Sequence, residues 1–367
     1  MSSAPKVGRG QVLAYRRIAN ALHERLDGGP DTLGVLDLGV PNVPAGAARQ
    51  ALAARCTRPL DGDLALAWST RGALHLHRPA DLPALAAALW PLGDTDAAAR
   101  FATGQLPPEA GKLGVEAFRA TAAAFQAVVR APSAKGDVSR AVSAQVPAEL
   151  TYDCRPCGAR HISGGLFQQA GLAGGVALDE DAAKTVLVPA HPRPSIPDFP
   201  FGTAGFVRAY LRLLGPATPG DAAKYIGTTV GALRPAWPGD LAEVSVDGRK
   251  AWLPPEDVDA LLAAPPIRGV RLLPPSDPFL QARDRSVLVP DKAQAKEVWR
   301  ILGNPGVLLL DGEISGTWRA RLVRSRLELT VTPWLPLTAA TRRCVDSEAQ
   351  TVAAARGLDS ADVKGLD

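Results

Sequence analysis

The chain has 367 residues, of which 46% are hydrophobic and 21% are charged. This balance excludes an intrinsically disordered protein, and the length predicts several compact modules. The 41 Lys and Arg and the 37 Asp and Glu give a net charge of +4, which allows a polyanionic partner. No stretch approaches the roughly 18 continuous apolar residues of a membrane helix, and the four cysteines do not form the pattern of a disulfide framework. We therefore expect a cytoplasmic protein with reduced thiols.

One pattern occurs three times along the first two thirds of the chain. Helical periodicity gives way to strand-like alternation around a tight turn, which is typical of a winged helix, a helix-turn-helix unit followed by a β-hairpin. The third copy is the clearest, because its hairpin is centred on Asp247-Gly248, a strong hairpin signal. We place the three modules at residues 1–112, 113–200 and 201–265.

The elements expected in each module follow in chain order. The first module has helical patterns at 12–26 and 46–56, a hairpin at 64–79 and a further helix from Asp81. The second has helical patterns at 116–130, 137–146 and 163–173 and a hairpin with an acidic turn at 176–190. The third has helical patterns at 205–215, 219–227 and 228–237 and a hairpin at 241–255.

After the third module the pattern changes to short β-rich runs, interrupted by one helical stretch at 293–302. A second Asp-Gly turn, Asp311-Gly312, joins two of these runs. We expect a small β-barrel domain over 266–345 and a loose C-terminal tail at 346–367. The predicted fold class is therefore α+β, with three tandem winged-helix modules followed by a small C-terminal β-barrel domain.

Positive charge is concentrated in the last domain. Between Arg268 and Arg326 there are 11 Lys and Arg but 6 Asp and Glu, an excess that favours contact with a DNA backbone over a merely solvated face. In the first module Arg71 stands at the hairpin tip, and His75 and His77 share one strand face. A solvated turn charge and an ordinary polar sheet surface are the alternatives there. The candidate DNA contacts are Arg71, His75, His77, Arg155, Arg160, His161, Lys224, Arg234, Arg249, Lys250, Arg283, Arg285, Arg319 and Arg321.

A short motif in the second module has the spacing of a metal-binding turn. Cys154 and Cys157 are separated by two residues, and His161 follows. Three local ligands leave a closed structural zinc site one ligand short, so that Cys56 or Cys344 would have to come from another module. We therefore predict packing rather than metal binding for this motif, and no cofactor for the chain.

Three segments resemble the family of bacterial winged-helix alkylpurine DNA glycosylases (AlkZ/YcaQ-like). They are ALAWSTRGALHLHRPADLPAL at 65–85, YDCRPCGARHISGGLFQQAGL at 152–172, and LLPPSDPFLQARDRSVLVPD with GNPGVLLLDGEISGTWRAR within 272–321. The resemblance extends from about residue 11 to 337. It implies a concave protein of tandem winged helices that grips duplex DNA and hydrolyses the N-glycosidic bond of alkylated or crosslinked purines, a function compatible with self-protection in a genotoxin producer.

The resemblance also implies a catalytic signature of Gln, an apolar residue, then Gln or Asp. The corresponding stretch is LGVLDLGVP at 33–41, where Asp37 takes the carboxylate place but Val35 and Leu36 stand where the first Gln is expected. Excision of a cationic purine has a good leaving group, so one carboxylate could both stabilise oxocarbenium-like charge and activate water. A turn or helix cap is the alternative role for Asp37.

The sequence therefore predicts a monofunctional DNA glycosylase that acts as a monomer on damaged double-stranded DNA. The missing glutamine supports a second hypothesis, a non-catalytic winged-helix DNA-binding protein that recognises damage or regulates transcription. Use of the modules for protein contacts alone is the third.

Overall fold

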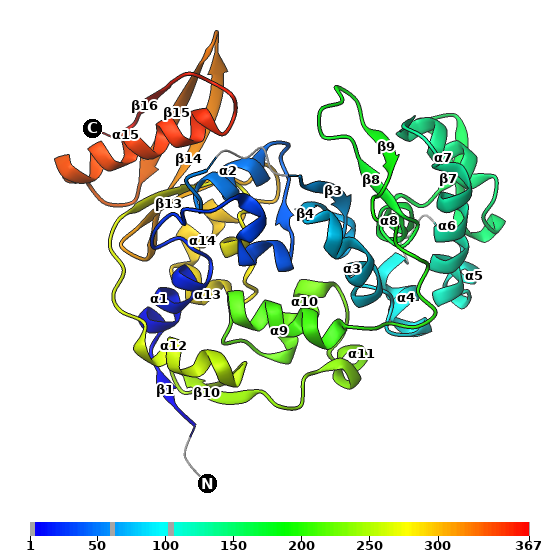
Figure 1. Ribbon diagram of the computed structural model, residues 1–367, viewed down its shortest axis with the longest axis horizontal. Coiled ribbons are helices and arrows are strands. Elements are labelled where there is room, and N and C mark those ends of the chain that lie inside the picture. Colours follow the sequence, from blue (N-terminus) through cyan, green and yellow to red (C-terminus); the bar gives the residue numbers. More distant parts are fainter. Residues whose placement is uncertain (1–3, 59–62, 102–105, 367) are drawn as a thin grey trace.

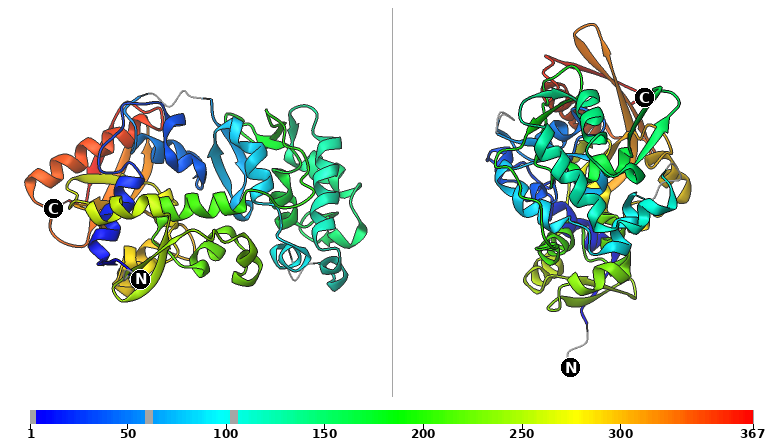
Figure 2. Two further views of the ribbon diagram at one scale, coloured as in Figure 1. Left: turned by 60° about the horizontal axis from the view of Figure 1, so that its bottom comes forward. Right: turned by 90° about the vertical axis from the view of Figure 1, so that its right-hand side faces the viewer.

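The computed structural model describes residues 4–58, 63–101 and 106–366. It is a mixed α+β structure, with α15 (Ala339–Ala354) and α7 (Lys135–Ser143) near opposite ends of its long axis and α9 (Thr203–Leu214) between them (Figure 1; Figure 2). None of the helices in these ranges is long and apolar enough to cross a bilayer.

The N-terminal part contains the helices and the hairpin that the sequence predicts there. Strands β3 (Ala65–Trp68) and β4 (Leu74–His77) pair antiparallel and are joined by the short turn η3 (Thr70–Gly72). The surrounding elements are β1 (Lys6–Val7), α1 (Arg9–Ala19), η1 (Pro30–Thr32), η2 (Gly34–Asp37), β2 (Val40–Pro41), α2 (Ala47–Ala53), η4 (Pro79–Asp81), α3 (Leu82–Ala88) and α4 (Asp94–Phe101).

The middle part contains the expected hairpin, formed by β8 (Val176–Leu178) and β9 (Val186–Pro189), and a second hairpin that the sequence did not predict. That second hairpin consists of β6 (Thr151–Cys154) and β7 (Ala159–Ile162). The remaining elements are α5 (Pro108–Lys112), α6 (Val115–Val128), β5 (Ser133–Ala134), α7, η5 (Ala148–Leu150) and α8 (Gly164–Gly171).

The first two predicted modules share one sheet. Its six strands lie in the order β2-β4-β3-β8-β9-β5, and Leu66 of β3 lies opposite Leu178 of β8. The Trp68 ring meets the Phe167 ring edge-on, with centroids 5.6 Å apart, and both side chains belong to one hydrophobic core. Residues on both sides of the predicted boundary near residue 112 therefore belong to one sheet and one hydrophobic core.

The third part has three helices followed by a hairpin, in the order that the sequence predicts. Helices α9, α10 (Pro219–Ile226) and α11 (Val230–Leu233) are followed by η6 (Arg234–Ala236) and by strands β10 (Ala242–Val246) and β11 (Arg249–Leu253). Asp247 and Gly248 both have positive φ, 46° and 82°, as a tight two-residue hairpin turn requires. Strand β1 adds parallel to β10 and completes a three-stranded sheet.

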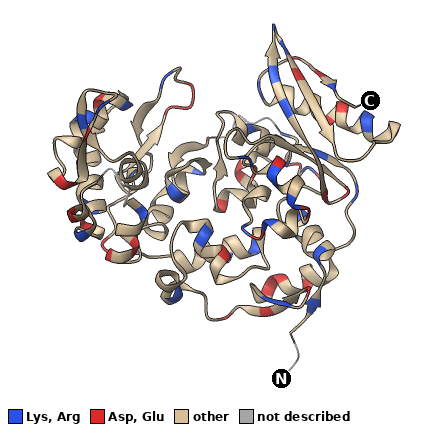
Figure 3. Cartoon of the chain, turned by 180° about the vertical axis from the view of Figure 1, so that it is seen from behind, with Lys and Arg blue, Asp and Glu red and all other residues tan. Residues whose placement is uncertain are grey.

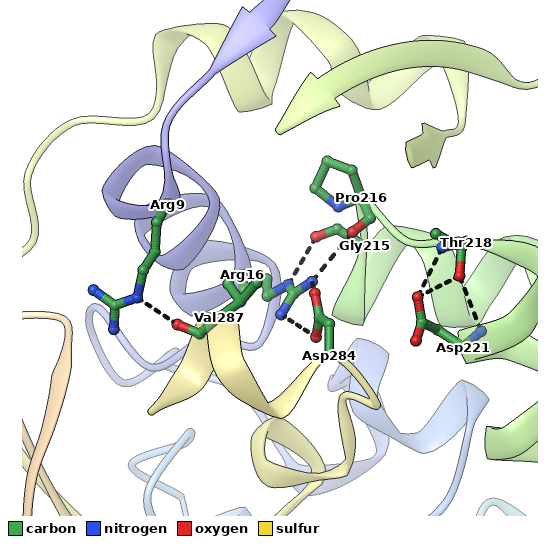
Figure 4. Close-up of polar contacts among 8 residues, drawn as sticks. All are labelled: Arg9, Arg16, Gly215, Pro216, Thr218, Asp221, Asp284 and Val287. Carbon is green, nitrogen blue, oxygen red and sulfur yellow. Dashed lines mark hydrogen bonds and ion pairs between the residues drawn. The ribbon is translucent and has the colours of Figure 1, made fainter. Parts of the chain in front are cut away.

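Local capping fixes the start of α10. Thr218 accepts a hydrogen bond from the backbone N–H of Asp221, and the Asp221 carboxylate accepts one from the backbone N–H of Thr218 (Figure 4). Two of the unpaired donors at the helix start are thereby satisfied. The helix consequently begins at Pro219, where the sequence places it.

The C-terminal part is built on a five-stranded sheet in the order β12-β13-β14-β15-β16. It is a half-barrel with β12 and β16 as edges, so the predicted small β-barrel domain is confirmed only as a half-barrel. The elements of this part are η7 (Pro255–Asp257), α12 (Val258–Ala263), β12 (Val270–Leu273), η8 (Pro278–Gln281), α13 (Arg285–Leu288), α14 (Lys292–Val298), β13 (Gly306–Leu310), β14 (Glu313–Val323), β15 (Arg326–Pro333), α15 and β16 (Ala361–Lys364).

The predicted loose tail is wrong, because the chain after residue 345 is part of the fold. Helix α15 covers the sheet with the buried side chains of Val345, Ala349 and Val352, which recur at helical spacing. Strand β16 then pairs parallel with β15. The helix and the strand bury apolar surface that an unstructured tail would leave exposed.

A fully buried ion pair joins the N-terminal part to the C-terminal part. Arg55, just after α2, donates to both carboxylate oxygens of Asp277 at 2.9 and 2.7 Å, and both side chains are 0% exposed. Asp277 also accepts from the backbone N–H of Phe279 at 2.9 Å and so begins η8. A buried charge needs this degree of pairing, and the pair is one of the contacts between the two parts.

Candidate functional site

The candidate catalytic residue, Asp37, lies between two arginines. It is the last residue of η2, and its Oδ1 accepts a hydrogen bond from Nη1 of Arg78 at 2.8 Å. Its Oδ2 accepts one from Nη2 of Arg212 on α9. Arg78 also donates to Asp81 at 3.0 Å and to the carbonyl of Leu33 at 2.8 Å. Asp37 therefore connects η2, the end of β4 and α9, a bridging role that the sequence did not predict.

The Asp37 carboxylate opens onto a pocket of about 390 Å³. Leu36, Leu85 and Phe206 supply apolar lining, and Arg208 and Arg212 contribute positive charge. The Asp37 side chain is 33% exposed, so it remains accessible from the pocket. Arg78 and Asp81 line it as well. A concave space that combines apolar lining with charged groups is a common form of a small-molecule or base site.

Each Asp37 oxygen already accepts one hydrogen bond. A carboxylate offers about four acceptor positions, so both oxygens could still bind a water or a positively charged group. The two guanidinium groups nevertheless offset the negative charge that would stabilise an oxocarbenium-like centre. Val35 and Leu36, which stand where the first Gln is expected, are 2% and 1% exposed. Their apolar side chains cannot orient a water by hydrogen bonding.

His75 and His77 share a strand face as predicted, but that face is buried. They are 4% and 1% exposed, and both rings contact the hydroxyl of Ser69, at 3.0 Å from Nδ1 of His75 and 2.9 Å from Nε2 of His77. Burial lowers the pKa of His75 to about 4 and that of His77 to about 3. The predicted DNA contact through these rings is therefore at odds with the structure. The strand face that carries both rings is covered by other parts of the chain, so DNA cannot reach them.

The turn that carries Arg71 is not a free hairpin tip. Gly72 has a φ of +71°, and a Cβ atom there would lie 3.1 Å from Gln168 and Gln169 of α8. Arg71, itself at a φ of 58°, extends over Gly227, where a Cβ would lie 2.6 Å from the Arg71 side chain. Glycine at these two positions lets the turn pack between α8 and α10. This packing directs the Arg71 side chain toward α10.

Arginines from two distant segments meet on one tyrosine. The Arg71 guanidinium lies 6.0 Å and that of Arg283 lies 5.9 Å from the centroid of the Tyr225 ring on α10, which is cation–π distance. Arg71 also donates to the carbonyl of Lys224 at 3.2 Å. Next to Arg283 along the chain, Arg285 stacks on Trp299 at 4.8 Å. We call Arg71, Arg283 and Arg285 the arginine cluster.

The charge of this cluster is not balanced by acidic groups. Among the residues that the structure describes, no carboxylate forms an ion pair with any of its three guanidinium groups, and Nε and Nη2 of Arg283 are buried with no hydrogen-bond partner. Burial lowers the pKa of Arg71, and the nearby charge of Arg285 acts in the same direction. Elsewhere both signs of charge are interspersed (Figure 3). Three neighbouring arginines without acidic partners can bind a polyanionic ligand such as a DNA backbone.

Comparison with known proteins identifies the family. The family model described as DNA glycosylase AlkZ-like matches residues 15–355. The chain belongs to the AlkZ-like DNA glycosylase family. It is 35% identical over 169 residues to an interstrand DNA cross-link repair glycosylase of Streptomyces sahachiroi, an alignment that covers 43% of this chain and 44% of that protein.

The fold is also that of a solved relative. The structure of Streptomyces sahachiroi DNA glycosylase AlkZ superposes with a TM-score of 0.75 at 22% identity and covers 98% of this chain and 99% of that chain. The whole architecture of this AlkZ-like protein, including the half-barrel, is thus shared with a known fold.

The other predicted cations of the AlkZ-like chain lie in three separate places. Arg234 follows α11, and Arg249 and Lys250 lie just after the β10–β11 turn, where Lys250 pairs with Glu243 at 3.1 Å. In the half-barrel Arg321 pairs with Glu328 at 2.5 Å. These side chains are exposed. Because Lys250 and Arg321 are paired with glutamates, their charge is less available to a ligand.

A second cavity, of about 520 Å³, lies beside β14. Arg319 lines it and donates to the carbonyl of Gly303 at 2.8 Å. Arg300 and Arg356 line it as well, and the sequence analysis did not select them. Nothing local marks these two arginines, because only the folded chain brings their segments beside β14.

The β6–β7 hairpin carries three further predicted residues, Arg155, Arg160 and His161, whereas the exposed Lys224 lies on α10. Arg160 is held to the hairpin base, since it donates to Oγ1 of Thr151 at 2.7 Å and to the carbonyl of Ala148 at 3.1 Å. Arg155 is exposed in the turn. His161 lies beside Cys154, and hydrogen bonds from Cys157 and His161 lower the pKa of the Cys154 thiol.

Proposed function

We propose that this AlkZ-like protein is a DNA glycosylase that releases alkylated or crosslinked purines from duplex DNA. The arginine cluster on Tyr225 and Trp299 is the observation that carries the proposal, because it presents unpaired positive charge within a member of a glycosylase family. The curated relative is named for interstrand cross-link repair, which supports bulky purine lesions as the substrate class.

Duplex binding would use several helices and hairpins at once. In this proposal the units that end in the β3–β4, β8–β9 and β10–β11 hairpins act as winged-helix modules that contact the DNA backbone. The order of helices and hairpin in the third part supports this assignment. The protein would act as an intracellular monomer, with the arginine cluster, Lys224, Arg234 and Arg319 binding phosphates.

In the same proposal Asp37 performs the chemistry. A cationic N-alkylated purine leaves readily, so the enzyme must stabilise developing positive charge on the sugar and direct a water to it. The Asp37 carboxylate, exposed to its pocket and positioned by Arg78 and Arg212, would supply a fixed negative charge and accept the proton of that water. An attacking water would then be held by Asp37 alone, whereas the family signature supplies both a glutamine and a second Gln or Asp.

A second candidate function is that of a protein that binds damaged DNA without releasing the damaged base. Two observations favour it: Val35 and Leu36 are buried where a glutamine is expected, and both Asp37 oxygens accept from arginines. A binder would keep the arginine cluster and its affinity for duplex DNA while having no base-release activity.

One assay separates these functions. The protein is incubated with duplexes that carry an N7-alkylguanine, a bulky guanine adduct or an interstrand crosslink, and the released base is quantified alongside binding at several salt concentrations. Release of a damaged base above the protein-free rate supports the glycosylase. Salt-sensitive binding without release establishes the binder, and absence of binding at low salt would refute both.

A further inference from the structure

The β6–β7 hairpin brings three soft-metal ligands together on one side. Cys154 ends β6, Cys157 follows within the turn, and His161 lies on β7. Their two sulfur atoms and a ring nitrogen lie within 4.8 Å of one another. Cys154 pairs with Ala159 and Tyr152 pairs with His161 in the antiparallel register, so Cys154 and His161 occupy the same face of the hairpin.

The separation of these atoms is close to that in a zinc site. Zinc binds thiolate sulfur at about 2.3 Å and imidazole nitrogen at about 2.0 Å in tetrahedral geometry, which separates two sulfurs by about 3.8 Å. Because the three atoms lie within 4.8 Å of one another, the side chains of Cys154, Cys157 and His161 would need to close by roughly 1 Å. Gly158 follows at a φ of +60°, which lets the chain reverse directly after the second cysteine.

The histidine is already oriented as a ligand. Nδ1 of His161 lies 3.1 Å from the carbonyl oxygen of Ile162 and donates its proton to it. Nε2 is then the ring nitrogen that can bind a metal, and metal binding would replace the hydrogen bond that the ring makes with Cys154. Metal-binding histidines commonly use such a hydrogen bond on the other ring nitrogen. The ring of Tyr152 also packs against that of His161, with centroids 4.9 Å apart, and restricts its rotation.

Positive charge near the three ligands does not block the site. Arg160 is tied to Thr151 and Ala148 at the base of the hairpin.

Cys154 and Cys157 are both free thiols. Cys56 is buried after α2, and Cys344 lies on α15 at the far end of the molecule from α7, against which β7 packs (Figure 1). Neither of the fourth ligands that the sequence analysis considered is therefore near the hairpin.

We propose that Cys154, Cys157 and His161 bind one Zn²⁺, with water in the fourth position. Binding converts two thiols and one Zn²⁺ into two Zn–S bonds and releases two protons, so the net charge of the hairpin does not change once the protons have left. Arg155 and Arg160 keep their charges. The metal crosslinks the turn to β7 and stiffens the hairpin on which these arginines lie.

Metal content and a spectroscopic probe test the proposal without an activity assay. The protein is purified with reductant, stripped with a chelator, mixed with Zn²⁺ and desalted. We expect about one retained zinc per chain and at least about a 10-fold lower content in Cys154→Ser and Cys157→Ser. With Co²⁺ in place of zinc, the wild type should show a thiolate-to-cobalt charge-transfer band that each cysteine variant loses, and His161→Asn should weaken retention.

The matched control is Cys344→Ser, which removes an exposed free thiol elsewhere and should leave zinc content and the cobalt spectrum unchanged. Hydrogen exchange of residues 151–162 should slow when zinc is added to the wild type but not to Cys154→Ser. Equal unfolding temperatures of the metal-free proteins show that the variants fold. The proposal is overturned if the stripped wild type retains no zinc, if Cys154→Ser retains as much as the wild type, or if a Cys154–Cys157 disulfide forms and zinc is excluded. The test does not depend on glycosylase activity.

Discussion

Arg16 of α1 donates hydrogen bonds to both carboxylate oxygens of Asp284, at 2.9 and 2.6 Å (Figure 4). The same guanidinium donates to the carbonyls of Gly215 and Pro216, at 3.0 and 3.2 Å. Asp284 separates Arg283 from Arg285, so this one buried arginine holds the loop that presents two members of the arginine cluster. It does so from a helix that lies some 270 residues earlier in the chain.

Replacing Arg16 should therefore destabilise the whole molecule. In Arg16→Met, Asp284 and two carbonyl groups lose their partner, and we expect the free energy of unfolding to fall by about 3 kcal/mol in urea titrations. The control is Arg140→Met, which removes an exposed ion pair with Asp137 and should cost less than about 0.5 kcal/mol. Equal losses in the two variants would contradict the role of Arg16.

Neutral substitutions in the arginine cluster should weaken duplex binding. In Arg71→Gln and Arg283→Gln the positive charge on the face of Tyr225 is lost, and each variant should lower the slope of log affinity against log salt by about 1. Fluorescence anisotropy of a labelled duplex at several salt concentrations measures this. Arg140→Gln, which lies on α7 and is ion-paired, should keep the wild-type slope. An unchanged slope in both cluster variants would remove these arginines from the interface.

Substitution of Asp37 should separate chemistry from binding. Asp37→Asn keeps the side-chain shape but removes the negative charge that faces the pocket, and we expect base release to fall by about 100-fold or more with the salt dependence of binding unchanged. Asp81→Asn is the control, because it removes another acceptor of Arg78 outside η2 and should retain most of the activity. Wild-type release by Asp37→Asn would exclude it as the catalytic carboxylate.

The buried histidines should make stability depend on pH. Their pKa values in the folded protein, about 4 for His75 and about 3 for His77, lie below the value of about 6.5 for an unfolded chain. The unfolded state therefore binds more protons below pH 6.5, and stability is complete above that pH and decreases as the pH falls toward 4. Each histidine should contribute a slope of about 1.4 kcal/mol per pH unit over this range.

The variant His77→Gln tests this slope. Urea unfolding between pH 4 and pH 6 should show a dependence on pH that is shallower by about 1.4 kcal/mol per unit than in the wild type. His191→Gln changes an exposed histidine and is the matched control. An identical slope in the wild type and His77→Gln would mean that the ring is accessible to protons in the folded state.

The features that short segments determine could be predicted from the sequence. The Asp247-Gly248 and Asp311-Gly312 turns join strands at the positions expected, because each pair adopts positive φ values that few other residues tolerate. Helix α10 starts at Pro219, as the proline at that position indicates. The order of the helices and the hairpin in the third part followed from such local signals.

Features that depend on distant segments could not be predicted in this way. Alternation correctly placed His75 and His77 on one face, but burial of that face depends on the strands and loops that cover it. The partners of Asp37 are Arg78, just after β4, and Arg212 on α9, and no local rule relates the three positions. The ordered C-terminal helix is different, because Val345, Ala349 and Val352 repeat at helical spacing and that signal was present in the sequence.

The pairing of β1 and α1 with segments far along the chain has a consequence for synthesis on the ribosome. Lys6 and Val7 pair with Ser245 and Val246, and Arg9 of α1 bonds to Glu313 at 2.7 and 2.5 Å. In a nascent chain, residues 6–9 therefore lack these partners until most of the described chain has been translated, although domains commonly fold from the N-terminus first. Nascent chains stalled before Ser245 should leave this segment open to proteases and chaperones.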